Sequence, residues 1–360
     1  MSSLLIIFLA ISCVVLAFVL SVGITPLAIL ISKKTGALDV PKDDRRMHKE
    51  PVPRLGGIAI FVSFFVCALI LLSLVSSGII VEADIEDMPE KIRAILVAGT
   101  LIFILGIVDD FKTIKARYKL LGQIGCSVVA FLLGIRIPAV ALFGWQFSEE
   151  SPGGIFISFI VTIVWLIAIT NMINLIDGMD GLAAGVSGIA ALAIAYTTYI
   201  TGYHTAAFAM AILAGAAFGF LPFNFYPAKI FMGDSGAMFL GFAIASVSII
   251  SPAKGATIVA IIAPVLVLGV PVFDLLFAMI RRKIRGQSMF EADKGHLHHQ
   301  LTQIGIGQRR AALMLYGISG IMGIAAIVFA RDYYLEAICL FLIAILFIIT
   351  LIWGWNIKDK

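Results

Sequence analysis

Long apolar runs alternate with short polar segments along almost the entire chain. Most of these runs approach the roughly 20 residues that an α-helix needs to cross a bilayer. The pattern predicts eleven spans, at Leu4–Ile31, Gly56–Val75, Ile92–Val108, Leu120–Ile135, Ile155–Ile169, Leu182–Thr201, Ala206–Leu221, Ala237–Ile250, Ala256–Ile280, Ala312–Ala330 and Leu335–Trp353. We therefore expect an all-α polytopic bundle of about eleven transmembrane helices that forms one integral membrane domain over residues 1–360.

The composition supports this class of protein. Hydrophobic residues make up 61% of the 360 residues and charged residues only 13%, whereas soluble domains are about half apolar and a quarter charged. A soluble enzyme, a disordered chain and a disulfide-rich secreted module are thereby excluded. The first apolar run has neither a basic start nor a small-residue cleavage site, so we interpret it as a retained span. The four cysteines lie in apolar runs without the spacing of metal ligands.

The distribution of basic residues predicts the orientation. If segment 33–54 is cytoplasmic and the spans alternate from there, the cytoplasmic segments hold 21 of the 26 Lys and Arg residues and the external segments hold 5. This asymmetry is what the positive-inside rule requires. We therefore expect a multi-pass membrane protein with an external N-terminus and a cytoplasmic C-terminus.

Polar clusters in five predicted cytoplasmic loops localise the chemistry. The loops cover about 33–55, 109–119, 170–181, 222–236 and 281–311. Ionisable groups close to the membrane are costly and are candidates for function. Because all five clusters fall on one predicted side, we expect them to converge at the cytoplasmic ends of the helices.

Two of the clusters are rich in carboxylates. Asp109 and Asp110 close the third span and could hold a divalent cation or accept a proton; the alternative is a solvated pair balanced by nearby lysines and Arg117. From residue 171 to 180, Asn or Asp recurs at every third position. Such residues would fan across half of an ideal α-helix, and would share one edge only in a 3₁₀ or looped segment. We predict a functional loop here, with turn and capping chemistry as the alternative.

The other three clusters suit phosphate groups. Asp234 stands between Gly233 and Ser235 where the eighth span begins, and a helix N-terminus favours a phosphate, whose metal a carboxylate could carry. The alternative is an ordinary N-cap. Phe231 could stack on a base or simply pack. The remaining candidates are a histidine block with an adjacent lysine and a basic loop with a guanidinium that can fork onto phosphate, namely Lys294, His296, His298, His299 and Arg54.

Together these motifs resemble the polyprenyl-phosphate N-acetylhexosamine-1-phosphate transferase superfamily, which is glycosyl transferase family 4. The resemblance covers residues from about 33 to 310 and rests on Asp109-Asp110, the Asn/Asp segment 171–181, Phe231–Gly236 and His296-Leu-His-His. Within the superfamily the chain is similar to the branch that transfers GlcNAc-1-phosphate from UDP-GlcNAc to undecaprenyl phosphate. That branch begins a cell-envelope glycan such as teichoic acid or O-antigen.

The resemblance implies a set of roles. A divalent cation, Mg²⁺ or Mn²⁺ in its place, would neutralise the donor pyrophosphate and stabilise the departing UMP. It would be bound by Asp180 and Asp234. Asp109 or Asp110 would act catalytically, by removing the residual proton of the acceptor phosphate or by placing the metal. The nucleotide sugar would be held by Asn174, Asp177, Asn224, Phe231, Lys294, His296, His298, His299 and, more weakly, Arg54.

Several alternatives stay open at this point. The phospho-MurNAc-pentapeptide branch of peptidoglycan synthesis is disfavoured by the expected eleven spans, by the interrupted histidine block and by Pro-Arg-Leu-Gly-Gly at 53–57. A secondary transporter should carry its ionisable groups near the midplane of repeated halves. A CDP-alcohol phosphotransferase would need an Arg shortly after Asp180-Gly181. We expect direct attack by the lipid phosphate over a covalent aspartyl intermediate, no nucleic acid partner, and, by family analogy only, a homodimer.

Overall fold

The computed structural model describes residues 3–40, 50–78, 88–142, 145–148, 151–250, 269, 272–273, 283 and 306–358. The ninth predicted span, Ala256–Ile280, and the candidates Lys294, His296, His298 and His299 lie outside these residues, apart from single positions in the span.

Each of the other ten predicted spans overlaps one helix. The helices are α1 (Ser3–Thr35), α2 (Gly57–Ser76), α3 (Met88–Lys112), α4 (Ala116–Leu132), α5 (Pro152–Ile176), α6 (Leu182–Ile200), α7 (His204–Asn224), α8 (Gly233–Ile250), α12 (Gln308–Phe329) and α13 (Tyr334–Lys358). Within the described part of the chain, eight helices are long and apolar enough to cross a membrane. Helix α4, with 17 residues, is shorter than a full span, as is the apolar part of α13. The fold is a multi-pass helical bundle; the count of eleven and the orientation stay predictions.

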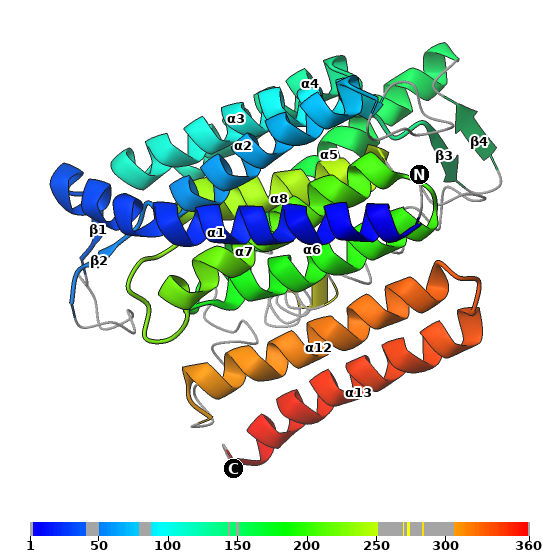
Figure 1. Cartoon of the computed structure of the whole chain (residues 1–360). Coiled ribbons are helices and arrows are strands. Elements are labelled where there is room, and N and C mark those ends of the chain that lie inside the picture. Colours follow the sequence, from blue (N-terminus) through cyan, green and yellow to red (C-terminus); the bar gives the residue numbers. More distant parts are fainter. Residues whose placement is uncertain are drawn as a thin grey trace.

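Two short antiparallel hairpins add the little sheet that the described residues contain. Strand β1 (Leu38–Asp39) pairs with β2 (Val52–Pro53), and β3 (Ala139–Leu142) pairs with β4 (Trp145–Ser148). Figure 1 shows the two hairpins at opposite ends of the bundle, with the helices running between them. Strands β1 and β2 belong to the predicted cytoplasmic loop 33–55. The end of the bundle at which they lie is therefore the predicted cytoplasmic end.

Helix α8 is the central helix of the bundle. It contacts α2, α3, α5, α6 and α7, and almost its whole length is buried, including Phe239 and Phe242. A helix that is apolar on all sides is expected at such a position. In contrast, α1 and α13 expose large apolar side chains such as Phe8 and Leu335, as expected of helices that face lipid. The first turn of α8 is thus fixed by its surroundings.

The predicted loops 109–119 and 170–181 are shorter than expected. Helix α3 continues through Asp109 and Asp110 to Lys112 and ends at Thr113, which has a left-handed backbone (φ 48°). Helix α5 continues to Ile176, so the segment from residue 171 is helical over its first half. The prediction of a loop or 3₁₀ segment there was wrong for residues 171–176. The apolar side chains of Ile173 and Ile176 are buried, and this burial favours continuation of the helix.

Candidate active site

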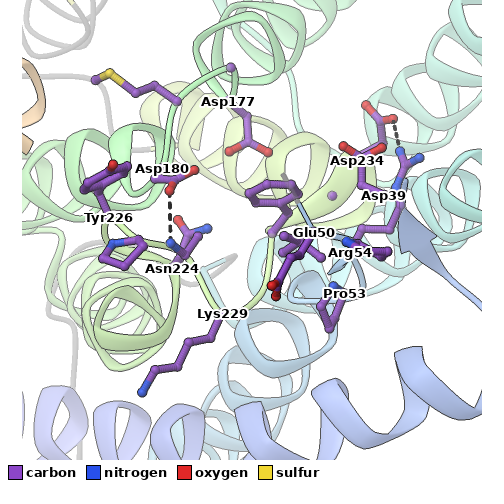
Figure 2. A pocket seen from close by; sticks show the side chains of 18 of the residues that line it. Asp39, Glu50, Pro53, Arg54, Asp177, Asp180, Asn224, Tyr226, Lys229 and Asp234 are labelled. Atoms are coloured by element: carbon purple, nitrogen blue, oxygen red, sulfur yellow. Dashed lines mark hydrogen bonds and ion pairs between the residues drawn. The ribbon is translucent and has the colours of Figure 1, made fainter. Parts of the chain in front are cut away.

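A cavity of about 970 Å³ lies at the β1–β2 end of the bundle (Figure 2). All five predicted loops contribute to its wall. The lining residues are Lys33, Asp39, Glu50, Pro51, Val52, Pro53, Arg54, Thr113, Asn174, Asp177, Gly178, Met179, Asp180, Asn224, Tyr226, Pro227, Ala228, Lys229, Phe231, Gly233, Asp234 and Gln308. The predicted convergence of distant polar segments is therefore observed for the described residues.

The first turn of α8 is capped by a carboxylate from another helix. Asp110 on α3 accepts hydrogen bonds from the backbone N–H groups of Asp234 (2.8 Å) and Ser235 (3.1 Å) and from the Ser235 hydroxyl (2.6 Å). A carboxylate satisfies the free N–H groups at a helix N-terminus and also favours its dipole. Gly233 has a φ of +73°, and a Cβ there would lie 2.2 Å from the carbonyl oxygen of Arg54 and 2.7 Å from Asp110 Oδ2. Only glycine fits this approach.

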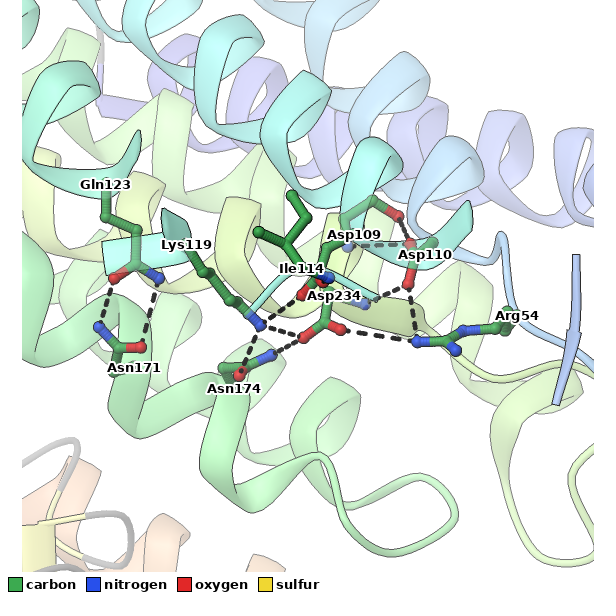
Figure 3. Close-up of polar contacts among 10 residues, drawn as sticks. Arg54, Asp109, Asp110, Ile114, Lys119, Gln123, Asn171, Asn174 and Asp234 are labelled. Carbon is green, nitrogen blue, oxygen red and sulfur yellow. Dashed lines mark hydrogen bonds and ion pairs between the residues drawn. The ribbon is translucent and has the colours of Figure 1, made fainter. Parts of the chain in front are cut away.

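Asp234 lies between two cationic side chains, as Figure 3 shows. Lys119 Nζ is 2.6 Å from its Oδ1, and Arg54 Nη2 is 3.6 Å from its Oδ2. The amide of Asn174 also donates to Oδ1, at 2.6 Å. The side chain of Asp234 is 21% exposed, so it reaches the cavity while these three groups hold it in place.

Asp109 is bound to the same lysine. Lys119 Nζ is 2.9 Å from Asp109 Oδ2, and it also donates to Asn174 Oδ1 at 3.3 Å. The other Asp109 oxygen accepts the backbone N–H of Ile114 at 2.5 Å. Lys119 thus joins oxygens from α3, α5 and α8 into one network, in which an ammonium group donates to three acceptors.

Asp177 and Asp180 lie on the loop between α5 and α6 and point toward the same cavity (Figure 2). Asp180 Oδ2 accepts the backbone N–H of Ala228 at 2.9 Å. Burial raises the pKa of Asp177 well above its usual range, and the like charge of Asp234 raises it further. Asp110 and Asp180 act in the same direction. This concentration of carboxylates creates an environment that favours a cation.

The segment before α2 pairs with the segment before α8 through the backbone. Phe231 N–H donates to the Pro53 carbonyl (2.7 Å), and the N–H groups of Gly56 and Gly57 donate to the carbonyls of Phe231 (3.0 Å) and Met232 (2.8 Å). These bonds place Arg54 next to Asp234. The close approach of the two segments accounts for the glycine pair, because a Cβ at Gly56 would lie 2.5 Å from the Phe231 carbonyl oxygen and one at Gly57 2.3 Å from the nitrogen of Gly236.

The structure assigns different surroundings to the predicted site residues. Arg54, Asn174, Asp177, Asp180, Asn224, Phe231 and Asp234 all line the cavity. Asn224 is 3% exposed, and its amide holds backbone: Oδ1 accepts from Gly181 N–H (3.2 Å) and Nδ2 donates to the Ile230 carbonyl (3.0 Å). Asp109 and Asp110 are not among the lining residues; they lie behind Asp234 and are 5% and 4% exposed.

Two polar features of the site were missed from the sequence. Lys119 had been considered only as a charge that balances Asp109 and Asp110, although it is the centre of the network. Asn171 and Gln123 exchange two hydrogen bonds, at 2.7 and 3.2 Å, which link α4 to α5. The sequence shows only that Lys119 lies at the start of an apolar run. It does not show which residues on other helices this lysine contacts.

The donor set is compatible with Mg²⁺. Carboxylate oxygens are hard ligands, and Mg²⁺ in proteins usually takes one or two of them together with phosphates and water. The predicted ligands Asp180 and Asp234 both line the cavity. Within the described residues, no three His, Cys, Asp or Glu side chains could hold a metal between them, so substrate oxygens would have to complete the coordination.

Comparisons with known proteins identify the family of the chain. Residues 92–252 match the model of glycosyl transferase family 4. A Bacillus subtilis (strain 168) protein named "Probable undecaprenyl-phosphate N-acetylglucosaminyl 1-phosphate transferase" is 35% identical, over 88% of this chain and 84% of its own length. The chain belongs to glycosyl transferase family 4. The superfamily and branch predicted from the motifs are thereby confirmed, and the protein is an enzyme of the phosphoglycosyl transferase class.

Two further relatives define the position within family 4. The decaprenyl-phosphate N-acetylglucosaminephosphotransferase of Mycobacterium tuberculosis (strain CDC 1551 / Oshkosh) is 34% identical, over 90% of this chain and 83% of its own. The phospho-N-acetylmuramoyl-pentapeptide-transferase of Halalkalibacterium halodurans is 29% identical, over 80% of this chain and 88% of its own. The family 4 chain is thus more similar to the N-acetylglucosamine relatives than to this member of the peptidoglycan branch.

Proposed function

We propose that this protein transfers GlcNAc-1-phosphate from UDP-GlcNAc to undecaprenyl phosphate, giving undecaprenyl-diphospho-GlcNAc and UMP. One observation carries the proposal: the carboxylates Asp177, Asp180 and Asp234 and the guanidinium of Arg54 line one cavity of about 970 Å³. A cavity of this size can hold a nucleotide sugar, and its carboxylates together with the adjacent cations suit a metal-bound diphosphate. The names of the N-acetylglucosamine relatives support the choice of donor and acceptor.

The chemistry is a displacement at phosphorus. An oxygen of the lipid phosphate attacks the β-phosphorus of the donor, and a new P–O bond forms. The bond from that phosphorus to the bridging oxygen breaks, and its electron pair leaves with UMP. A phosphomonoester has its second pKa near about 6, so the acceptor is mostly dianionic at neutral pH and needs orientation more than a base. We therefore favour direct attack over a covalent aspartyl intermediate.

We propose that the residues of the cavity bind different parts of the donor. Bound by Asp180 and Asp234, Mg²⁺ would supply charge neutralisation on the pyrophosphate and the departing UMP. Arg54 presents a guanidinium, which matches phosphate geometry in a bidentate way. Phe231 offers an aromatic surface at the cavity wall, and we propose that it contacts the uracil base. Asn174 orients Asp234 through its 2.6 Å hydrogen bond.

Asp109 and Asp110 support the site from behind in this proposal. Asp110 caps α8 through three hydrogen bonds, and Asp109 holds Lys119. These contacts support a role in placing Asp234, which was one of the two roles expected from the resemblance. Proton removal by either carboxylate stays the alternative, and it would show as a pH dependence of the corresponding variant.

The location of the cavity suits two substrates of different origin. A polyprenyl chain stays in the bilayer while its phosphate lies at the surface, and a nucleotide sugar arrives from water. The cavity is at one end of the bundle, beside the β1–β2 hairpin, where both can meet. We propose that this is the cytoplasmic face, because the positive-inside distribution of Lys and Arg favours that orientation. A transporter site would instead be expected near the midplane.

A donor panel tests the proposal. Purified protein in detergent receives undecaprenyl phosphate, Mg²⁺ and, separately, UDP-GlcNAc, UDP-GalNAc or UDP-MurNAc-pentapeptide; released UMP and the lipid product are both measured. We expect product with UDP-GlcNAc and loss of turnover when EDTA removes the metal. Product from the pentapeptide donor alone would assign the protein to the peptidoglycan branch. We propose that the product starts a cell-envelope glycan, such as a teichoic acid or an O-antigen.

A further inference from the structure

A tyrosine from α12 reaches the loop that carries Asp177 and Asp180. Tyr316 donates its hydroxyl hydrogen to the carbonyl oxygen of Gly181 at 2.6 Å. Gly181 is the last residue before α6, and its φ is +77°. Helix α12 lies far along the chain from this loop and outside the residues that match the family model, so the contact is not part of the motifs discussed above.

The ring of Tyr316 fits into a notch on α6. A Cβ added at Gly185 would lie 2.2 Å from the ring carbon Cζ and 2.5 Å from the hydroxyl oxygen. Only glycine at position 185 leaves room for the Tyr316 ring, because real Cβ atoms do not approach other atoms so closely. Two glycines at this spacing usually indicate close helix packing. Here the missing side chain of Gly185 leaves room for the Tyr316 ring, and the Tyr316 hydroxyl contacts the Gly181 carbonyl.

The same loop is also held by the end of α7 and by the segment that follows it. Gly181 N–H donates to Asn224 Oδ1 (3.2 Å), and Asp180 Oδ2 accepts the N–H of Ala228 (2.9 Å). Tyr316 therefore completes a two-sided clamp in which the N–H and C=O of Gly181 are both fixed. A loop held in this way presents its carboxylates to the cavity in one orientation.

We propose that Tyr316 is a positioning residue, whose hydroxyl fixes the Gly181 carbonyl and thereby orients Asp177 and Asp180 toward the donor. This inference rests on the proposed function. It is a role in orientation more than in folding, because the Gly181 carbonyl also accepts the N–H of Gly185 at 2.9 Å. Removal of the tyrosine hydroxyl therefore leaves no buried carbonyl without a donor, and the cost in stability should be small.

Tyr316→Phe tests the inference with the loss of one oxygen atom. We expect kcat/KM for UDP-GlcNAc to fall about tenfold, which corresponds to the loss of one well-made hydrogen bond, while KM for undecaprenyl phosphate stays unchanged. The thermal stabilisation that UDP-GlcNAc gives the detergent-solubilised protein should shrink, with the ligand-free melting temperature close to that of wild type. Tyr199→Phe, at the opposite end of α6, is the matched control and should change neither quantity.

A second variant reaches the same ring without removing the hydroxyl. Gly185→Ala places a methyl group against the Tyr316 ring and should displace it, giving the same donor-specific loss. Wild-type kinetics in both variants would overturn the inference, as would a marked fall of the ligand-free melting temperature in both, since the loss of activity would then report less folded enzyme. Wild-type protein that formed no lipid product in the donor panel would overturn the proposed function and this inference with it.

Discussion

Two pairs of carboxylates flank Asp234, and they stand in opposite environments. Asp110 is enclosed, accepts three hydrogen bonds from the start of α8 and pairs with Arg54 at 3.3 Å, while Asp109 is paired with Lys119. Asp177 and Asp180 face the cavity, and burial, followed by the like charges of neighbouring carboxylates, raises the pKa of Asp177. The same residue type thus serves two purposes: the enclosed pair holds the first turn of α8 and Lys119 in place, and the cavity pair lies where a ligand can reach it.

The strongest test of this comparison is Asp234→Asn, since Asp234 lines the cavity while its backbone N–H is bound by the enclosed Asp110. The change keeps the shape of the side chain but removes the charge that Lys119 and Arg54 face. We expect transfer to fall by about 1,000-fold or more, because electrostatic groups of an active site carry large effects. UMP release and lipid product are the measurements, and Asp332→Asn at the exposed turn after α12 is the control. Near-normal rates would remove Asp234 from the site.

Lys119→Met removes the cation that joins Asp109 of the enclosed pair to Asp234 at the cavity wall. Asp109 and Asp234 would then lose a partner at 2.9 and 2.6 Å. We expect transfer to fall about 100-fold, because the loss of one member of a largely buried ion pair leaves the other charge uncompensated. Lys119→Arg keeps the charge and should retain more activity than Lys119→Met. Equal activity of the two variants would mean that the charge of Lys119 is not what the site requires.

Asp110→Asn tests whether the enclosed pair builds the site or reacts in it. The amide can accept only through one atom, so part of the α8 cap is lost. We expect transfer to fall about 30-fold and the free energy of unfolding to drop by about 2 kcal/mol, the scale of hydrogen bonds to a charged group. The loss of rate should be the same at every pH for a positioning role. A loss that shrinks as the pH rises would instead assign Asp110 to proton removal.

Asp177→Asn should have the smallest effect, on the pH dependence of stability. Because the folded protein holds the Asp177 proton more tightly than the unfolded chain, the ligand-free protein loses stability as pH rises from about 4, the ordinary Asp value, through the raised pKa. The Asn variant carries no charge at any pH. Its melting temperature should therefore fall less over this window. Identical curves for wild type and variant would show that the pKa of Asp177 does not differ between the folded and the unfolded protein.

The sequence allowed the helices to be predicted because lipid demands long apolar runs, and a run such as Leu182–Thr201 coincides with α6 almost to the residue. It also allowed Asp234 to be placed at the start of a helix, because the small residues Gly233 and Ser235 flank it directly before an apolar run. What failed was the boundary of α5. The polar spacing from residue 171 suggested a loop, but buried Ile173 and Ile176 keep the segment helical.

Contacts between distant helices were not predictable in the same way. Periodicity tells which face of a helix is apolar, but it does not tell which residue on another helix that face meets. Lys119 reads as an ordinary interface lysine until α3, α5 and α8 are placed around it. Tyr316 reads as one aromatic residue in an apolar span until its hydroxyl is seen at Gly181. Both roles depend on tertiary partners more than 50 residues away along the chain.

The burial of α8 has a consequence for how the enzyme could move. This helix contacts five others, and its N-terminus is capped by Asp110 from a neighbour, so Asp234 cannot travel without carrying the centre of the bundle along. The loop that carries Asp180 is also held, through the N–H of Ala228 and the hydroxyl of Tyr316. Both carboxylate-bearing sides of the cavity are therefore fixed in advance, and on binding it is the substrates that have to adapt their conformation.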